Sequence, residues 1–124
     1  MKFDIDLFRS LMLDMTEKPL KGDIIVIDFD EDIEKYPDKS LVAYHYTLMG
    51  QAGFLKVIQR IGTLEEPSGM LVSPLTYQGQ QYIESIKDDT TWTEFKKWLR
   101  EKRVALTAEI VVKALPLFLN KFIL

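Results

Sequence analysis

The 124-residue sequence contains no cysteine and only one histidine, His45. Without cysteine, the chain cannot form a disulfide framework, a thiol nucleophile, a cysteine-based zinc site or an iron–sulfur cluster. A lone histidine with no nearby nucleophile or carboxylate also lacks the pattern of a catalytic triad. These absences predict a protein that is not an enzyme, that binds no cofactor and no metal, and that resides in the cytoplasm.

Long apolar runs and glycine-rich loops are missing as well. Asp4 and Asp6 interrupt any apolar segment of the kind found in a signal peptide. The most apolar stretch, residues 106–124, contains charged residues and Pro116, whereas a membrane-spanning helix needs about 20 mostly apolar residues. No glycine pattern follows a strand in the manner of a phosphate-binding loop. We therefore expect neither a membrane anchor nor a nucleotide site.

The remaining composition predicts a folded domain with an uneven charge distribution. The chain is 47% hydrophobic and 28% charged, with a net charge of -3, which suits one compact domain with an adequate core. Residues 28–38 contain six acidic residues and one lysine, whereas residues 96–103 contain five basic residues and one glutamate. We expect the folded molecule to be acidic in one place and basic in another.

Apolar spacing and helix-capping residues predict the order of the elements. The second helix is expected to turn Val42, Tyr46, Met49 and Ala52 inward, and Pro116 is expected to kink or end the last helix. The predicted elements are, in order, a helix over residues 4–17 capped by Asp4, a strand over 24–29, a helix over 38–52, strands over 54–61 and 70–73 joined by a loop over 62–69, a helix capped by Thr76, a helix beginning at the capping box Thr91–Glu94, and a helix capped by Thr107.

This order is that of a winged helix in which the acidic segment shortens or replaces the second helix. We therefore predict an α+β fold. Residues 1–87 form a winged helix-turn-helix-like domain with a shortened second helix and a small antiparallel β-wing, and residues 88–124 form a C-terminal helical appendage. The appendage packs on the domain or forms a homodimer interface through its large apolar residues. The predicted dimer contacts are Leu115, Phe118, Leu119 and Phe122.

Two segments resemble signatures of a known family. Residues 44–55, YHYTLMGQAGFL, resemble the HLxxLxxAGLI pattern that ends a winged-helix recognition helix. Residues 75–83, LTYQGQQYI, resemble the LTxxGxxFL pattern that follows the wing. With residues 88–92 and the helix over 106–114, residues 1–115 resemble a family of small bacterial and prophage proteins, the domain of unknown function 2513. The resemblance implies a winged-helix fold and a mobile-element setting, and it transfers no catalytic residue.

DNA binding by a winged-helix transcriptional regulator is the first functional hypothesis. The second predicted helix would enter double-stranded DNA, and the wing would add cations. Affinity for DNA depends on Lys and Arg contacts to phosphate, yet this face is thinly basic, and Glu65 and Glu66 at the wing tip would repel phosphates. The bases of residues 96–103 would compensate if they folded onto the same side. The predicted nucleic-acid-binding residues are Lys39, Ser40, Ala43, Tyr44, Thr47, Gln51, Lys56 and Arg60.

The alternative hypothesis is an acidic protein–protein interaction module that mimics DNA and inhibits a host nucleic-acid-binding enzyme. Its carboxylates do not form a calcium loop, because Ile33 and Lys39 stand where that loop needs glycine and glutamate. A two-metal nuclease would need further acids and a base brought together in space. His45 is either an inward, hydrogen-bonded residue or an exposed groove contact. The predicted contacts with a basic host protein are Asp28, Asp30, Glu31, Asp32 and Glu34.

Overall fold

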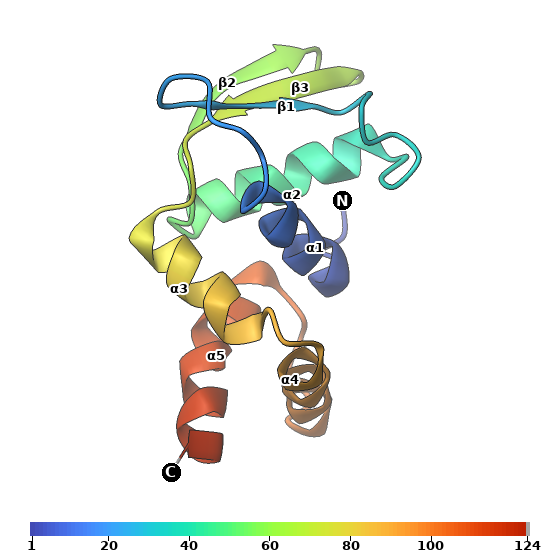
Figure 1. Cartoon of the computed structure of the whole chain (residues 1–124). Helices are drawn as coiled ribbons and strands as arrows, with labels where there is room; N and C mark the ends of the chain where they lie inside the picture. The colour runs from blue at the N-terminus through green and yellow to red at the C-terminus, as the bar shows by residue number, and fades with distance from the viewer. Residues whose placement is uncertain (124) are drawn as a thin grey trace.

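The computed structural model describes the backbone of residues 1–123 and the side chains of residues 1–121. In this part of the chain, five helices accompany one three-stranded antiparallel sheet, which confirms the predicted α+β class. Figure 1 shows the sheet on one side of α2, α1 on the other side, and α4 and α5 at the opposite end of the molecule from the sheet. The elements are α1 (Ile5–Met15), β1 (Ile25–Asp28), α2 (Lys39–Gln51), β2 (Val57–Gly62), β3 (Pro67–Val72), α3 (Tyr77–Ile86), α4 (Asp89–Glu101) and α5 (Ala108–Ile123).

Side-chain caps start the first helix and the helix after the sheet. Asp4 Oδ1 accepts hydrogen bonds from the backbone N–H groups of Asp6 and Leu7, both at 3.0 Å. Thr76 Oγ1 accepts one from the N–H of Gly79 at 3.2 Å. Each bond satisfies a backbone donor that has no partner inside its helix. The predicted caps Asp4 and Thr76 are therefore confirmed.

The predicted start of α4 is wrong, whereas the predicted cap of α5 is confirmed. The carboxylate of Asp88 accepts a hydrogen bond from the N–H of Thr91 at 2.9 Å, so α4 begins at Asp89. Thr91 lies in the first turn as a donor to the cap and does not act as the cap itself. This bond to the charged form holds the pKa of Asp88 below its usual value. In α5, Thr107 Oγ1 accepts the N–H of Ile110 at 3.2 Å.

The strand order of the sheet is β1-β3-β2, and both pairings are antiparallel. Ile25 and Ile27 of β1 pair with Val72 and Met70 of β3, respectively. All four side chains are buried. One face of the sheet therefore belongs to the core, and its register is fixed by that burial.

The β2–β3 hairpin has a shorter loop than the sequence predicts. β3 begins at Pro67, so only Thr63–Glu66 connect the two strands. Proline lacks a backbone donor and is tolerated at the first residue of a strand. Gly62 has a φ of 94°, a conformation that favours glycine, at the position where the chain enters the turn. Together these residues shorten the connection.

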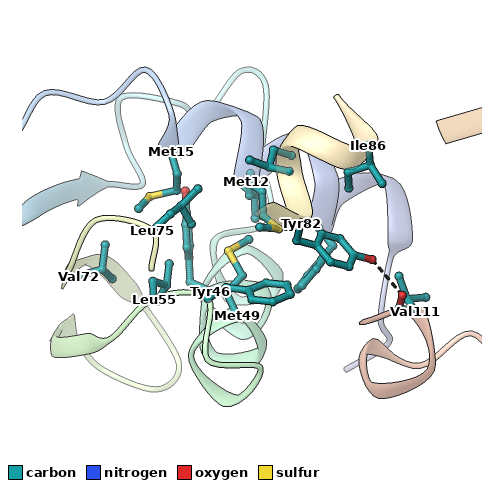
Figure 2. Packing of buried hydrophobic residues seen from close by; sticks show 14 of the residues in the cluster. Met12, Met15, Tyr46, Met49, Leu55, Val72, Leu75, Tyr82, Ile86 and Val111 are labelled. Carbon is teal, nitrogen blue, oxygen red and sulfur yellow. Dashed lines mark hydrogen bonds between the residues drawn. The ribbon is translucent and has the colours of Figure 1, made fainter. Parts of the chain in front are cut away.

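The main core lies between α1, α2 and the sheet. Val42, Tyr46 and Met49 are 5%, 1% and 0% exposed, which confirms the inward stripe, and Ala52 is half-buried. Figure 2 shows Tyr46 and Met49 packed among the buried methionines of α1 and the apolar residues that follow α2. Burying a large apolar side chain stabilises the fold by about 1.5–3 kcal/mol. This stripe holds α2 in place.

Aromatic packing joins the C-terminal helices. The ring centroid of Phe118 lies 5.2 Å from that of Phe95 and 5.7 Å from that of Trp98. Tyr82 of α3 donates a hydrogen bond to the carbonyl of Val111 at 3.0 Å (Figure 2). α5 continues through Pro116 to Ile123, so the proline does not end the helix. No helix within residues 1–123 combines the length and apolarity needed to cross a membrane.

The residues predicted as dimer contacts have a role inside the single chain. Leu115 and Phe118 are 3% and 2% exposed, and Leu119 is partly buried against the same core. The side chain of Phe122 lies outside the described residues. Because their own chain already covers Leu115 and Phe118, these two side chains act as core residues of the protomer. A homodimer through this helix stays a prediction.

Candidate recognition surface on helix α2

The outward side of α2 carries the helical residues predicted to recognise nucleic acid. Ser40, Ala43, Tyr44 and Thr47 are half-buried and Gln51 is exposed. Two hollows flank this side of the helix, and Tyr44 lines both of them. The structure therefore brings these five residues together along one helix, between two concave surfaces.

The α2–hairpin groove, of about 520 Å³, lies between α2 and the β2–β3 hairpin. Arg60 of β2 donates a hydrogen bond from Nη2 to Thr47 Oγ1 at 3.0 Å, which ties the hairpin to α2. Ile61, Leu64 and Met70 make the hairpin side of this groove largely apolar. Lys56 is exposed and lines neither hollow. The guanidinium of Arg60, predicted as a DNA contact of the wing, is thus engaged by Thr47 of α2.

Carboxylates surround the only lysine of α2. Lys39 forms an ion pair with Asp30, and this hydrogen-bonded contact raises the pKa of Lys39. The two residues border an acidic notch of about 740 Å³ between the start of α2 and the hairpin, which Asp38, Glu65 and Glu66 also line. The N-terminal end of α2 is therefore acidic, in spite of its lysine.

Most of the predicted protein-contacting acids have partners within the chain. Asp28 Oδ1 accepts the N–H of Asp30 at 2.9 Å, and Asp32 pairs with Lys18 at 3.4 Å. Glu31 and Glu34 are exposed. Ion pairs with Lys18, just after α1, and with Lys39, the first residue of α2, therefore hold this segment against the rest of the chain. Across the described residues, no three histidine or carboxylate side chains are grouped as a metal site would require.

A network of short hydrogen bonds anchors the end of the acidic segment. Tyr36 donates from its hydroxyl to Asp14 Oδ2 at 2.6 Å, and its oxygen lies 2.6 Å from Ser10 Oγ. Lys35 pairs with the other oxygen of Asp14 at 3.2 Å. Burial and the hydrogen bond to Asp14 raise the pKa of Tyr36. The segment that connects β1 to α2 is therefore held in one position against α1.

His45 is a buried structural residue of α2. Its side chain is 0% exposed, and its ring stacks on Phe3 with a centroid distance of 5.5 Å. Nε2 lies 2.8 Å from the backbone nitrogen of Asp4 and Nδ1 lies 2.8 Å from the carbonyl oxygen of Leu41. Because a backbone N–H can only donate, Nε2 accepts and Nδ1 carries the proton. The inward alternative is the one that the structure adopts.

The basic segment lies far from α2. Lys97, Arg100, Lys102 and Arg103 are exposed on and after α4, at the opposite end of the molecule from the hairpin (Figure 1). None of the four forms an ion pair with the described residues, whereas Lys96 pairs with Asp6 of α1 at 2.8 Å. These bases therefore do not join Lys39, Lys56 and Arg60 in one continuous face.

The second hollow was not predicted from the sequence. The α2–α5 groove, of about 800 Å³, lies between the end of α2, the start of α5 and the first three residues. Leu48 of α2 and Phe3, Leu106 and Val112 give it an apolar lining. These residues come from three segments that are distant in sequence, so no local pattern marks the groove.

Comparisons with known proteins place this chain in a family. No solved structure matches it. An uncharacterized protein of Haemophilus influenzae (strain Rd) is 28% identical over 112 residues, which cover 90% of this chain and 89% of that relative. A family model described as hypothetical protein (DUF2513) matches residues 2–105. This match confirms the resemblance seen in the sequence, and the chain belongs to that family.

Proposed function

We propose that the protein is a non-enzymatic recognition protein built on a winged-helix frame, and that its acidic α2–hairpin end binds a protein with a basic surface. The observation that carries this proposal is the acidic notch at the start of α2, which Asp30, Asp38, Glu65 and Glu66 line together with a single cation, Lys39. The mobile-element setting in which we place this activity follows from the sequence resemblance.

The connectivity supports the winged-helix part of the proposal. Helix α1, strand β1, helix α2 and the β2–β3 hairpin follow one another, and the sheet order is β1-β3-β2. Residues 29–37 stand where a helix-turn-helix has the helix before its recognition helix, and α2 takes the recognition position. Fold alone does not decide what such a helix recognises, so the side chains must decide it.

The charges favour a protein over DNA as the partner. In helix-turn-helix proteins the N-terminal residues of the recognition helix contact base edges in the major groove. Here that end bears more carboxylates than cations, and its one lysine is paired with Asp30. Carboxylates at this place repel phosphates and attract lysine and arginine side chains of a partner. A basic nucleic-acid-binding protein is the partner that fits this surface.

A DNA-binding regulator is the second candidate, and the position of two cations favours it. Arg60 lies against α2 through Thr47, and Lys56 stands exposed at the start of the same hairpin. Both are placed where a wing would approach the sugar–phosphate backbone beside the recognition helix. For DNA to bind, these two contacts must outweigh the repulsion from the acidic notch.

The experiment is a capture of partner proteins from a nuclease-treated bacterial lysate at low salt, followed by mass spectrometry. The test variant is Glu65→Lys with Glu66→Lys, which reverses the charge of the notch. The matched control is Glu94→Lys with Glu101→Lys, which makes the same change in net charge at exposed sites of α4. We expect a basic protein to bind the wild type and the control but not the test variant.

A partner that both variants retain, or that both lose, would contradict the proposal. Retention by both variants would place the contact elsewhere on the molecule. Loss in both variants would show that binding depends only on net charge. Circular dichroism of the variants checks that both fold, as expected for substitutions at exposed sites.

A further inference from the structure

The turn of the β2–β3 hairpin presents one exposed leucine beside two glutamates. Leu64 is 90% exposed, and Glu65 and Glu66 follow it. The turn is closed on itself, since Thr63 Oγ1 accepts the N–H of Glu66 at 2.9 Å and the N–H of Thr63 donates to the Glu66 carbonyl at 3.2 Å. A side chain held on such a turn loses little conformational entropy when it binds. We name residues 63–66 the hairpin tip.

The α2–α5 groove is complementary to the hairpin tip in polarity and in charge. Its lining is mostly apolar and includes Leu106, which is 42% exposed. Its charged residues are Lys2, Glu109 and Lys113, and the last two neutralise each other in an ion pair of 2.8 Å. Lys2 forms no ion pair with the described residues, so it leaves the groove with a net positive charge. An apolar side chain followed by carboxylates fits such a groove.

The tip does not reach the groove of its own chain. It borders the acidic notch at the start of α2, beside Asp38 and Lys39. The groove lies at the other end of the helix, where Gln51 and Ala52 line it. Leu64 also lines the α2–hairpin groove, which shares Met1 and Tyr44 with the α2–α5 groove, but none of residues 63–66 lines the α2–α5 groove itself. Leu64 stays 90% exposed on its own chain, so a second molecule would have to cover it.

We infer that the hairpin tip of one copy docks in the α2–α5 groove of a second copy. Leu64 enters the apolar lining near Leu106, and Glu65 and Glu66 lie beside Lys2. The contact joins two different surfaces, so each copy keeps one free tip and one free groove, and association is open-ended. One hairpin tip buries far less area than a stable interface of about 1,200–2,000 Å², so the association is weak and depends on concentration. It requires no other protein, and it shares Glu65 and Glu66 with the acidic notch of the proposed function.

Sedimentation velocity of the purified full chain, at concentrations up to about 1 mM, tests this inference. We expect the average mass of the wild type to rise with concentration past that of a dimer. Leu64→Ser removes the apolar anchor, and Leu106→Glu puts a carboxylate against the incoming glutamates. Each is expected to weaken the association constant about tenfold, as the loss of a central contact does. Leu117→Ser, at an exposed leucine of α5 outside the groove, is the control and should leave association unchanged.

Mixing the two variants gives the sharper result. The Leu64→Ser variant keeps an intact groove and the Leu106→Glu variant keeps an intact tip, so one productive contact remains per pair of molecules. We expect the mixture to stop at the mass of a dimer, whereas the wild type continues to grow. A wild type that stays monomeric at about 1 mM, a variant that associates like the wild type, or a mixture that grows like the wild type would each overturn the inference.

Discussion

At the residue scale, one ion pair joins the two sets of residues predicted to bind partners. Lys39 belongs to the set expected to contact DNA and Asp30 to the set expected to contact a basic protein, and the structure pairs them with each other. An exposed ion pair costs little to separate, so it does not by itself decide between the partners. The other carboxylates of the notch, Asp38, Glu65 and Glu66, make this surface negatively charged.

His45 provides a prediction about stability. Its buried ring fills the space beside Phe3 and bonds the backbone of Asp4 and Leu41. Replacing it with alanine leaves a cavity and unpaired polar groups, so we expect His45→Ala to lower the free energy of unfolding by about 2–4 kcal/mol. Urea denaturation measures the loss. Gln51→Ala, an exposed change in the same helix, should stay within about 0.5 kcal/mol of the wild type, and an equal loss in both variants would contradict the structural role of His45.

Asp6 provides a prediction about pH dependence. Its carboxylate accepts hydrogen bonds from Trp92 Nε1 at 2.9 Å and Lys96 Nζ at 2.8 Å, which join α1 to α4. Partial burial raises the pKa of Asp6, but the bonds from Lys96 and Trp92 outweigh it and hold the pKa below its usual value. Because the folded state lowers this pKa, the carboxylate stabilises the fold above about pH 4, and its contribution is lost as the pH falls through the lowered value.

The variant Asp6→Asn is therefore expected to be less stable than the wild type at pH 6 and nearly equal to it at pH 2–3, so far as both remain folded. Water screens the mostly exposed carboxylate, so the loss at pH 6 is about 0.5–1 kcal/mol. Urea unfolding at several pH values measures the difference. Asp23→Asn, at an exposed site, is the control and should show no such trend. A difference between Asp6→Asn and the wild type that stays constant with pH would rule out the carboxylate as the stabilising group.

At the element scale, the last helix carries an unfavourable residue. α5 continues through Pro116, which is exposed. A proline inside a helix lacks a backbone donor and crowds the carbonyl four residues earlier, here that of Val112. We expect Pro116→Ala to raise the free energy of unfolding by about 1–2 kcal/mol, less than the full propensity difference, because the proline also restricts the unfolded chain.

Thermal denaturation of Pro116→Ala tests this prediction, with Asn120→Ala as a control at an exposed site of the same helix. The expected result is a higher midpoint for Pro116→Ala than for Asn120→Ala. A lower midpoint for Pro116→Ala than for the wild type would mean that the helix needs the proline where it stands.

Local signals made most elements predictable from the sequence. Caps such as Asp4 and Thr76 satisfy backbone donors within four residues, and the stripe of α2 follows helical spacing. The prediction for the start of α4 was wrong because Asp88 and Thr91 are both suitable caps and lie three residues apart. The sequence does not say which of the two donates to the other. The predicted hairpin loop was too long because the glycine and proline residues that signal a turn also lie at the ends of the flanking strands.

The candidate site was predictable only in part, because recognition surfaces depend on distant segments. The outward residues of α2 follow from the inward stripe, since both lie on one helix. The bond between Arg60 and Thr47, the pairing of Asp30 with Lys39 and the α2–α5 groove depend on how separate elements pack. No spacing rule within one element contains that information.

At the scale of the whole molecule, the two charged segments lie at different ends. The acidic notch stands beside the hairpin, and the unpaired bases lie on and after α4 at the far end (Figure 1). The net charge of -3 for the whole chain therefore does not represent the local charge at either end of the molecule. A ligand that approaches the N-terminal end of α2 meets a negative surface, and this placement is the reason why we favour a basic protein as the partner at that end.

The binding of a labelled, random-sequence DNA duplex, followed by fluorescence anisotropy at about 50 mM salt, tests the choice of partner most directly. We predict no saturable binding by the wild type, because the cations that face DNA from α2 and the hairpin are few and Lys39 is paired. Saturable binding that weakens with added salt and is lost in Lys56→Ala and Arg60→Ala would contradict the account and identify the α2–hairpin end as a DNA-binding surface.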